Sequence, residues 1–341
     1  MSQTIICGDS AKELKKFTDN SIDAVITDPP YGIEFLAKEW DSNTGAVEIW
    51  SECLRVLKPG GHLLAFSAAR TYHQLATNIE SVGFEVRDQI MWLYASGFPK
   101  GQDIGKSIQR RQGVKETKAY KQNVPRNGGD GDTKHYENTG EVVPTCEEAV
   151  KWTGWKTQLK PAHEPIVMAR KPMKTSTIDN VLAHGVGALN IDATRIGERF
   201  PSNVVGEVAG YQKFFYCPKV SREERHRGFE QTGIPTNKGR MLDRPTDGSE
   251  WVLSQHRDEK ARTQANVSNN NHPTVKPVEL MKYLIELVAP PGSHIMDPFA
   301  GSGTTGMAAK ELGYTFTGIE MDHAYCEIAK QRIAATTQEL T

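Results

Sequence analysis

The sequence has few cysteines and no long apolar segment. Its five cysteines (Cys7, Cys53, Cys146, Cys217 and Cys326) form no Cys-x-x-Cys pair, which argues against a disulfide framework and against a zinc site. No apolar run approaches the roughly 18 to 20 residues that a membrane span requires. Residues 1–9 lack the basic segment and apolar stretch of a secretory signal. These absences predict a soluble protein of the cytoplasm, and the ten histidines, in no ligand spacing, predict no metal site.

The chain also lacks a large net charge, which at first argues against a nucleic-acid partner. Residues 1–95 carry 8 basic and 13 acidic side chains, and residues 271–341 carry 5 and 8, whereas residues 96–270 carry 28 and 21. The densest positive stretch, residues 100–127, has 8 basic side chains against 2 acidic ones. A charge run is often only a solvated face, but this asymmetry also predicts that the middle region contacts a polyanion.

Strand and helix patterns alternate at both ends of the chain. Strands are predicted at 4–7, 22–27, 62–67, 84–94, 294–296 and 315–319, and helices at 10–17, 47–57, 72–82, 304–312 and 323–334. Ser10 is the expected N-cap of the first helix, and Thr274 is expected to cap a further helix with Pro277 in its first turn. Such alternation predicts an α/β fold with a mostly parallel, doubly wound sheet.

A glycine-rich turn lies between the strand and the helix predicted near residue 300. It reads DPFAGSGTTG over Asp297–Gly306, and Met307 stands where a Walker phosphate loop would need lysine. Glycines let the backbone approach a ligand, and Glu320 closes the next strand, where an acidic side chain accepts hydrogen bonds from ribose hydroxyls. Only a circular permutation, with residues 1–95 supplying the missing strands, would complete this fold. It would bring the turn beside Asp28 at one sheet edge.

The segment Asp28-Pro29-Pro30-Tyr31 ends another predicted strand. The prolines lack backbone donors, so this turn presents carbonyl groups and the Asp28 carboxylate as acceptors, with an aromatic ring next to them. Such a cluster suits a planar group with an amino substituent, because the acceptors bind the N–H groups while Tyr31 stacks on the ring.

Together these motifs resemble the DNA amino-methyltransferases of the permuted, β-class order. In that family the catalytic motif comes first, a target-recognition region second, and the S-adenosylmethionine (SAM) motif last. Cys7-Gly8-Asp9, the run HPTVKP at 272–277 and Gly318-Ile319-Glu320 resemble further family segments. The resemblance covers residues 1–95 and 271–341, and it implies a Rossmann-like SAM-methyltransferase fold with an inserted target-recognition region.

The resemblance also implies a role for each matched residue. Asp28 and the Pro29 carbonyl would hold the target amino group, and Tyr31 would stack on a base extruded from the duplex. The implied catalytic residues are Asp28, Pro29, Pro30 and Tyr31. The implied SAM-binding residues are Asp9, Asp28, His272, Thr274, Lys276, Asp297, Phe299, Ala300, Gly301, Ser302, Gly303, Thr304, Glu320 and Met321. An Asp at the head of the motif is typical of adenine N6 methylation, whereas Ser is typical of cytosine N4.

Five segments follow from these assignments. They are the catalytic half of the core (1–95), a basic, loop-rich insertion (96–154), a segment with a core strand near 165–169 (155–172), a candidate target-recognition region (173–270) and the SAM-binding half (271–341). Within the middle, Trp152, Trp155 and the aromatic run 214–216 are predicted to form a small core rather than a base-contacting surface.

Several alternatives to adenine methylation of duplex DNA remain open at this point. Cytosine-N4 methylation, or adenine methylation in RNA, would use the same motifs. A nicotinamide-dependent oxidoreductase would use the GxGxxG pattern, but it gives Asp28–Tyr31 no role. A non-catalytic nucleic-acid binder would need neither motif intact. DNA is the expected partner, no membrane contact is expected, and a homodimer is left open.

Overall fold

The computed structural model divides the chain into two compact units, each of which is described by itself. The first consists of Met1–Ala95 together with His163–Thr341, and the second of Ser96–Ala162. The structure describes residues 1–33, 43–94, 101–113, 117–122, 136–143, 145–206, 220–229, 270, 272 and 274–338. Among these residues, no helix has the length and apolar character that crossing a membrane requires.

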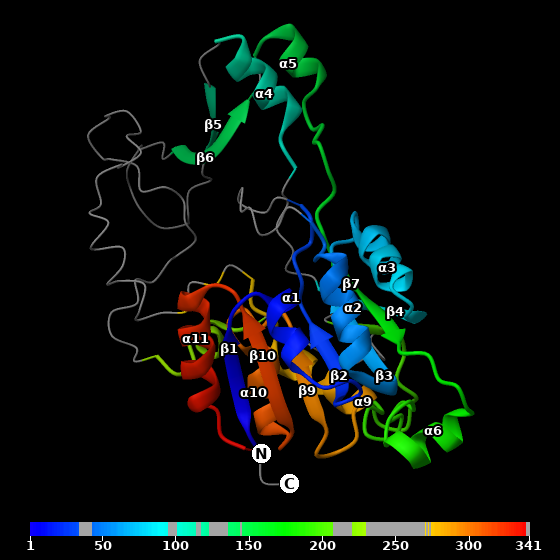
Figure 1. Ribbon diagram of the computed structural model, residues 1–341. Coiled ribbons are helices and arrows are strands. Elements are labelled where there is room, and N and C mark those ends of the chain that lie inside the picture. The colour runs from blue at the N-terminus through cyan, green and yellow to red at the C-terminus, as the bar shows by residue number, and fades with distance from the viewer. Residues whose placement is uncertain are drawn as a thin grey trace. The chain divides into compact units, whose positions relative to one another are not determined.

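An eight-stranded sheet forms the centre of the first unit, in the order β1-β10-β9-β2-β3-β7-β4-β8 (Figure 1). Its strands are β1 (Gln3–Cys7), β2 (Ile22–Thr27), β3 (Leu57–Phe66), β4 (Glu85–Leu93), β7 (His163–Arg170), β8 (Val204–Gly206), β9 (His294–Asp297) and β10 (Thr315–Glu320). All neighbours pair in parallel except β7, which is antiparallel to β3 and β4. Two strands from the C-terminal end of the chain, β10 and β9, therefore lie between β1 and β2 from the N-terminal end, as the predicted circular permutation requires.

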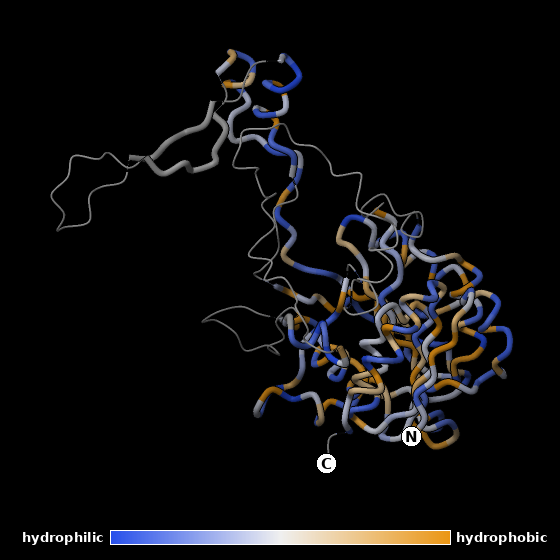
Figure 2. Tube along the Cα trace, turned by 90° about the vertical axis from the view of Figure 1, so that its left-hand side faces the viewer, coloured by the Kyte–Doolittle hydropathy of each residue, from blue (hydrophilic) through white to orange (hydrophobic). Residues whose placement is uncertain are grey.

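Helices cover both faces of this sheet. The described helices of this unit are α1 (Ser10–Glu13), the 3-10 helix η1 (Leu14–Lys16), α2 (Val47–Val56), α3 (Tyr72–Ser81), α6 (Thr177–His184), α7 (Arg222–Arg225), α9 (Val278–Val288), α10 (Thr304–Glu311) and α11 (His323–Ala334). Ile26 and Leu64 pack with α9 and α10 in one apolar cluster, whereas Val25 and Leu63 pack with α2 and α3 in another. Successive strand residues point to opposite faces, so the nearly continuous apolar strands fill two cores. Figure 2 shows that apolar residues concentrate in the interior of this unit. The predicted doubly wound fold is confirmed.

Three of the predicted element ends are wrong by a few residues. Asp9 rather than Ser10 caps α1, because the Asp9 carboxylate accepts the N–H of Ala11 at 2.9 Å. The Pro-Gly-Gly run after Lys58 does not precede β3 but lies inside it, where a bulge interrupts the pairing with β2. Helix α9 begins at Val278 with Pro277 in the N-cap position, so Thr274 caps nothing.

The second unit contains elements that the weak periodicity of its sequence does not predict. They are α4 (Ile104–Arg111), β5 (Thr117–Gln122), β6 (Tyr136–Val143) and α5 (Glu147–Lys151), with β5 antiparallel to β6. The prediction that Trp152 and Trp155 form a small core is wrong. They follow the end of α5, are 38% and 61% exposed, and contact each other with ring centroids 5.2 Å apart. The aromatic run 214–216 lies outside the described residues.

Candidate active site

The two predicted motifs meet where β2 and β9 end. These strands pair in parallel, and the Thr27 hydroxyl donates to Asp297 Oδ1 at 2.6 Å. Thr27 immediately precedes Asp28, and Asp297 opens the glycine-rich turn. The contact between the two motifs that the permuted sheet predicts is therefore present.

Asp28 lies in a cluster of four polar side chains, the carboxylate cluster, made of Asp28, Tyr31, Glu164 and Lys276. The Tyr31 hydroxyl is 2.8 Å from Asp28 Oδ1 and 3.0 Å from Glu164 Oε2. Lys276 Nζ donates to Asp28 Oδ2 and, at 3.0 Å, to the Tyr31 hydroxyl, and it lies 3.5 Å from Glu164 Oε2. The Lys276 side chain is only 7% exposed, so this lysine belongs to the site rather than to the surface.

Sequence reasoning missed Glu164. It lies near the start of β7, and β7 runs antiparallel to its neighbours, so its amino end lies at the edge where the parallel strands end. An acidic residue just before the apolar run 165–169 was the available signal. Reading that signal required the direction of β7, which the local sequence does not encode.

Burial dominates the electrostatics of the carboxylate cluster. It raises the pKa of Asp28, an effect that Lys276 opposes and the Glu164 charge reinforces. Burial alone would lower the pKa of Lys276, but the charges of Asp28 and Glu164 outweigh it and raise that pKa. Burial and the same two carboxylates raise the pKa of Tyr31 well above its ordinary value. Lys276 therefore stays protonated and Tyr31 keeps its hydroxyl proton.

Asp297 holds the glycine-rich turn to the sheet. Besides Thr27, the Thr305 hydroxyl donates to its Oδ2 at 2.6 Å and the Phe299 N–H to its Oδ1 at 3.0 Å. Burial raises the pKa of Asp297 to about 6, although these three donors oppose the rise. Because both carboxylate oxygens accept hydrogen bonds from the protein, Asp297 fixes the shape of the glycine-rich turn.

The turn glycines are required by close protein neighbours. At Gly303, where φ is +79°, an added Cβ would lie 2.9 Å from Ala329 Cβ and 3.0 Å from Ala329 Cα, both on α11. At Gly301, with φ of +50°, it would lie 2.9 Å from the His272 ring. The imidazole of His272 therefore covers the turn, and its Nδ1 is 2.6 Å from the Thr274 carbonyl oxygen.

Two further turn residues point into the protein. Ser302 and Thr304 are buried, and their hydroxyls accept from Arg332 Nη1 at 2.9 and 3.1 Å. Arg332 is itself fully buried on α11, and its Nη2 reaches the Glu224 carbonyl oxygen at 3.3 Å. The Glu224 carboxylate accepts the N–H of Val278, the first residue of α9, at 2.6 Å. The side chains of Ser302 and Thr304 thus anchor the glycine-rich turn to Arg332 in the protein interior.

Glu320 lies at the end of β10 with capacity to accept more hydrogen bonds. Its oxygens accept the N–H groups of Gly301 at 2.9 Å and Asp322 at 2.8 Å, which leaves lone pairs for ribose hydroxyls. Next to it the Met321 side chain is 68% exposed, an apolar surface that a purine ring can cover. Phe299 packs on Trp50, with ring centroids 5.8 Å apart. This set of groups fits the adenosine part of SAM.

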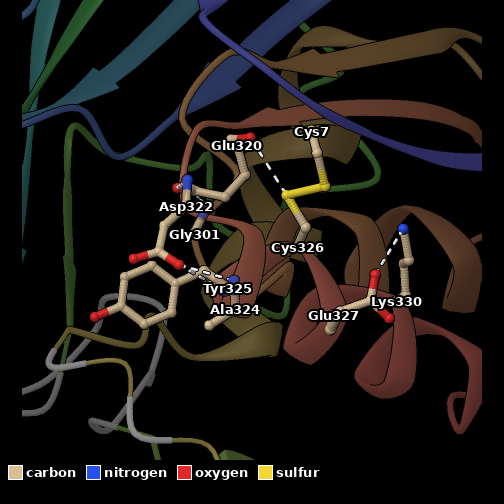
Figure 3. The surroundings of a disulfide bond; sticks show 9 residues. All are labelled: Cys7, Gly301, Glu320, Asp322, Ala324, Tyr325, Cys326, Glu327 and Lys330. Atoms are coloured by element: carbon tan, nitrogen blue, oxygen red, sulfur yellow. Dashed lines mark hydrogen bonds and ion pairs between the residues drawn. A yellow bond between two sulfur atoms is a disulfide. The ribbon is translucent and has the colours of Figure 1, made fainter.

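A disulfide between Cys7 and Cys326 lies beside Glu320 (Figure 3). Cys7 is opposite Glu320 in the register of β1 and β10, and Cys326 Sγ is 3.3 Å from the Glu320 carbonyl oxygen. The expectation from cysteine spacing that the chain has no such bridge is therefore corrected. Spacing along the sequence detects local pairs, whereas these two cysteines are 319 residues apart and meet only because both chain ends join one sheet edge.

The remaining predicted residues are distributed around this edge. Pro29 is buried and Pro30 half-buried, and the Ala300 N–H donates to the Ile319 carbonyl at 2.9 Å. Asp9, which the resemblance implies as a SAM-binding residue, uses Oδ1 to cap α1. Thr274 supplies its carbonyl oxygen to His272. Lys276, another implied SAM-binding residue, forms an ion pair with Asp28.

Comparison with known proteins defines the class and then the family. The chain shares its fold with the cytosine-N4-specific PvuII DNA methyltransferase, at a TM-score of 0.50 and 14% identity over 97% of this chain and 86% of that one. The family model described as DNA methylase, covering N6 and N4 enzymes, matches residues 22–331. The chain therefore belongs to the N6/N4 DNA methylase family, whose members use SAM, and the oxidoreductase alternative falls.

Two curated relatives match over nearly the whole chain. Type II methyltransferase M.HindIII of Haemophilus influenzae is 27% identical over 98% of this chain and 96% of its own length. DNA adenine methyltransferase YhdJ of Escherichia coli is 24% identical over 97% of this chain and 83% of its own. The resemblance inferred from the motifs is confirmed at the level of the family.

Proposed function

We propose that this protein transfers a methyl group from SAM to the N6 amino group of an adenine in DNA. The observation that supports this proposal is the contact between the end of β2 and the glycine-rich turn, because it brings the two motifs to one sheet edge. Aspartate at the head of the motif favours adenine, and the relative YhdJ is named an adenine methyltransferase.

Asp28 and the Pro29 carbonyl would accept hydrogen bonds from the two N–H groups of the target amine. An exocyclic amine is a poor nucleophile because its lone pair is delocalised into the ring, and such acceptors localise that pair on nitrogen. Asp28 retains a lone pair on each oxygen beyond the bonds to Tyr31 and Lys276. The half-buried Tyr31 ring would stack on the extruded base.

SAM supplies an electrophilic methyl group on sulfur when it is bound. Glu320 would hold its ribose, Met321 and Phe299 would contact its adenosine part, and the turn at Gly301 would lie against it. The protein's contribution is to align the amine with the methyl group, because a fixed approach removes most of the entropic cost of the transfer.

Cytosine-N4 methylation is the second candidate. The PvuII enzyme is named a cytosine-N4-specific methyltransferase and has the same fold, so the fold does not discriminate between the two bases. A homodimer and a location in the cytoplasm remain proposals, and sedimentation velocity on the purified chain tests the first of them.

The deciding experiment identifies the product. Purified protein is incubated with methyl-labelled SAM and unmethylated duplex DNA, and the DNA is digested to nucleosides for mass spectrometry. We expect labelled N6-methyldeoxyadenosine. Labelled N4-methyldeoxycytidine would establish the second candidate instead, and absence of label from all nucleosides would overturn both.

A further inference from the structure

The carboxylate cluster has a place for one more proton. The Tyr31 hydroxyl lies within hydrogen-bond distance of both Asp28 Oδ1 and Glu164 Oε2, but a hydroxyl donates only one hydrogen bond. It accepts two, and Lys276 supplies one of these. With both carboxylates ionised, one of the two oxygen–oxygen contacts has no proton. A single proton added to either carboxylate would make both of these contacts hydrogen bonds.

Methylation of an amine releases one proton, and this rests on the proposed function. The new carbon–nitrogen bond forms as the carbon–sulfur bond breaks, and the electron pair of that bond goes to sulfur. The nitrogen then carries a positive charge and one hydrogen too many. Asp28, which would accept a hydrogen bond from this nitrogen, is the group in place to take the proton.

We propose that Glu164 is a positioning residue that receives this proton from Asp28 through the Tyr31 hydroxyl. Asp28 gives the proton to the Tyr31 oxygen while Tyr31 gives its own hydroxyl proton to Glu164. The step leaves Asp28 ionised, Tyr31 unchanged and Glu164 neutral, so charge and protons balance. Asp28 is then ready for another amine, and the Glu164 side chain, 17% exposed, can release the proton to water.

The groups around Glu164 agree with this role. Tyr31 and Asp28 face it from the end of β2, Lys276 from the segment before α9, and Tyr94, which follows β4, also donates to it. Lys276 is the cation of this set, so two ionised carboxylates leave the cluster with a net negative charge. The Glu164 charge raises the pKa of Asp28 beyond the effect of burial. Glu164 therefore increases the proton affinity of the cluster, which a proton acceptor needs.

The test compares multiple-turnover methyl-transfer rates across pH in wild type, Glu164→Gln, Tyr31→Phe and the double variant. The substituted side chains keep the shape of the originals, and phenylalanine keeps the stacking ring. We expect Glu164→Gln to slow transfer by about 10²-fold, the lower range for a positioned proton acceptor. We also expect the acidic limb of the pH–rate profile of Glu164→Gln to move to lower pH, because Asp28 loses a like-charged neighbour. The double variant should be no slower than the slower single variant, since both residues serve one path.

The controls separate this inference from the proposed function. SAM affinity by calorimetry should be equal in all four proteins. Absence of transfer by wild type would reject the proposed function itself. An active wild type with an unchanged rate and limb in Glu164→Gln, or losses that multiply in the double variant, would overturn the role of Glu164. If Glu164→Gln does not fold, an unchanged limb in Tyr31→Phe would overturn it equally.

Discussion

At the scale of single residues, the acidic side chains at the sheet edge divide by how many of their acceptor positions the protein occupies. Asp297 accepts three hydrogen bonds, from the Thr27 and Thr305 hydroxyls and the Phe299 N–H, so this carboxylate holds the glycine-rich turn to the sheet. Asp28 and Glu320 each retain lone pairs toward the site. An acidic side chain thus holds the backbone in place at the end of β9, whereas acidic side chains at the ends of β2 and β10 are able to bind ligands.

Asp28→Asn should keep SAM binding and lose methyl transfer. The substitution preserves shape but replaces one acceptor oxygen by an amide that cannot accept from the target amine. Loss of such an electrostatic contact typically costs about 10²–10³ in rate. Single-turnover transfer and calorimetric SAM affinity measure the two effects separately. Turnover within a few-fold of wild type would show that Asp28 does not contact the reacting nitrogen.

Gly303→Ala should destabilise the fold more than Gly185→Ala. Both glycines have positive φ, +79° and +72°, so each substitution costs roughly 1–2 kcal/mol of backbone strain. Gly185 ends α6 with nothing within 4 Å of an added Cβ, whereas at Gly303 that atom meets Ala329. Overpacking should add about 1–3 kcal/mol at Gly303. Equal midpoints in urea denaturation would show that α11 moves aside.

At the scale of elements, the sequence is a good guide where one periodicity covers a whole segment. The bounds of β2 and α11 were predicted to the residue, because a largely apolar run and a capped helix each end at a polar turn. The start of β3 was not, since Pro59-Gly60-Gly61 has the local signature of a break, and backbone hydrogen bonds of Gly60 and Gly61 with Lys171 hold this run in the strand. The helices and strands of the second unit were missed because its sequence has little periodicity.

The pairing of β3 with β7 should make stability depend on pH through His62. Burial, then the nearby charges of Arg170 and Arg87, lowers the pKa of this histidine to about 4. Its Nδ1 has no hydrogen-bond partner among the described residues. The unfolded chain therefore binds the proton more readily than the folded one, and stability is lost as pH falls from about 6.5 toward 4.

His62→Gln should make the free energy of unfolding less dependent on pH. The slope should fall by up to about 1.4 kcal/mol per pH unit, the contribution of one proton. The matched control is His184→Gln on α6, where the side chain is exposed. Urea denaturation at pH values between 4 and 7 gives the slope for each protein. If the free energy of unfolding of His62→Gln has the same pH slope as that of wild type, protonation of His62 does not destabilise the folded protein.

At the scale of the whole molecule, the sequence predicted which strand ends meet but not how the side chains there contact one another. The motifs at Asp28 and Asp297 identify one sheet edge because parallel strands end together. The pairing of Lys276 with Asp28, and the presence of Glu164, depend on side-chain packing between segments more than 100 residues apart. The bridge between Cys7 and Cys326 is likewise a consequence of topology.

The charge distribution separates the acidic catalytic parts from a basic middle, and it predicts where DNA phosphates bind. Arg110 and Arg111 end α4 in the second unit and are exposed, within the densest positive stretch. Each cation on a phosphate releases condensed counterions, so replacing both by alanine should make the log–log salt slope shallower by up to about two units. Binding should weaken alike for all sequences, because phosphate contacts carry no base information.

The matched control replaces two exposed lysines of the sheet unit, Lys16 and Lys330, which pair with Glu13 and Glu327 on the surface. These substitutions remove the same formal charge, so a purely global effect of charge would change both double variants equally. We expect the control to keep the wild-type slope in fluorescence-anisotropy titrations at several salt concentrations. If the Arg110 and Arg111 variant also keeps it, α4 does not contact DNA. Equal changes in both variants would instead show that net charge, rather than a located surface, governs binding.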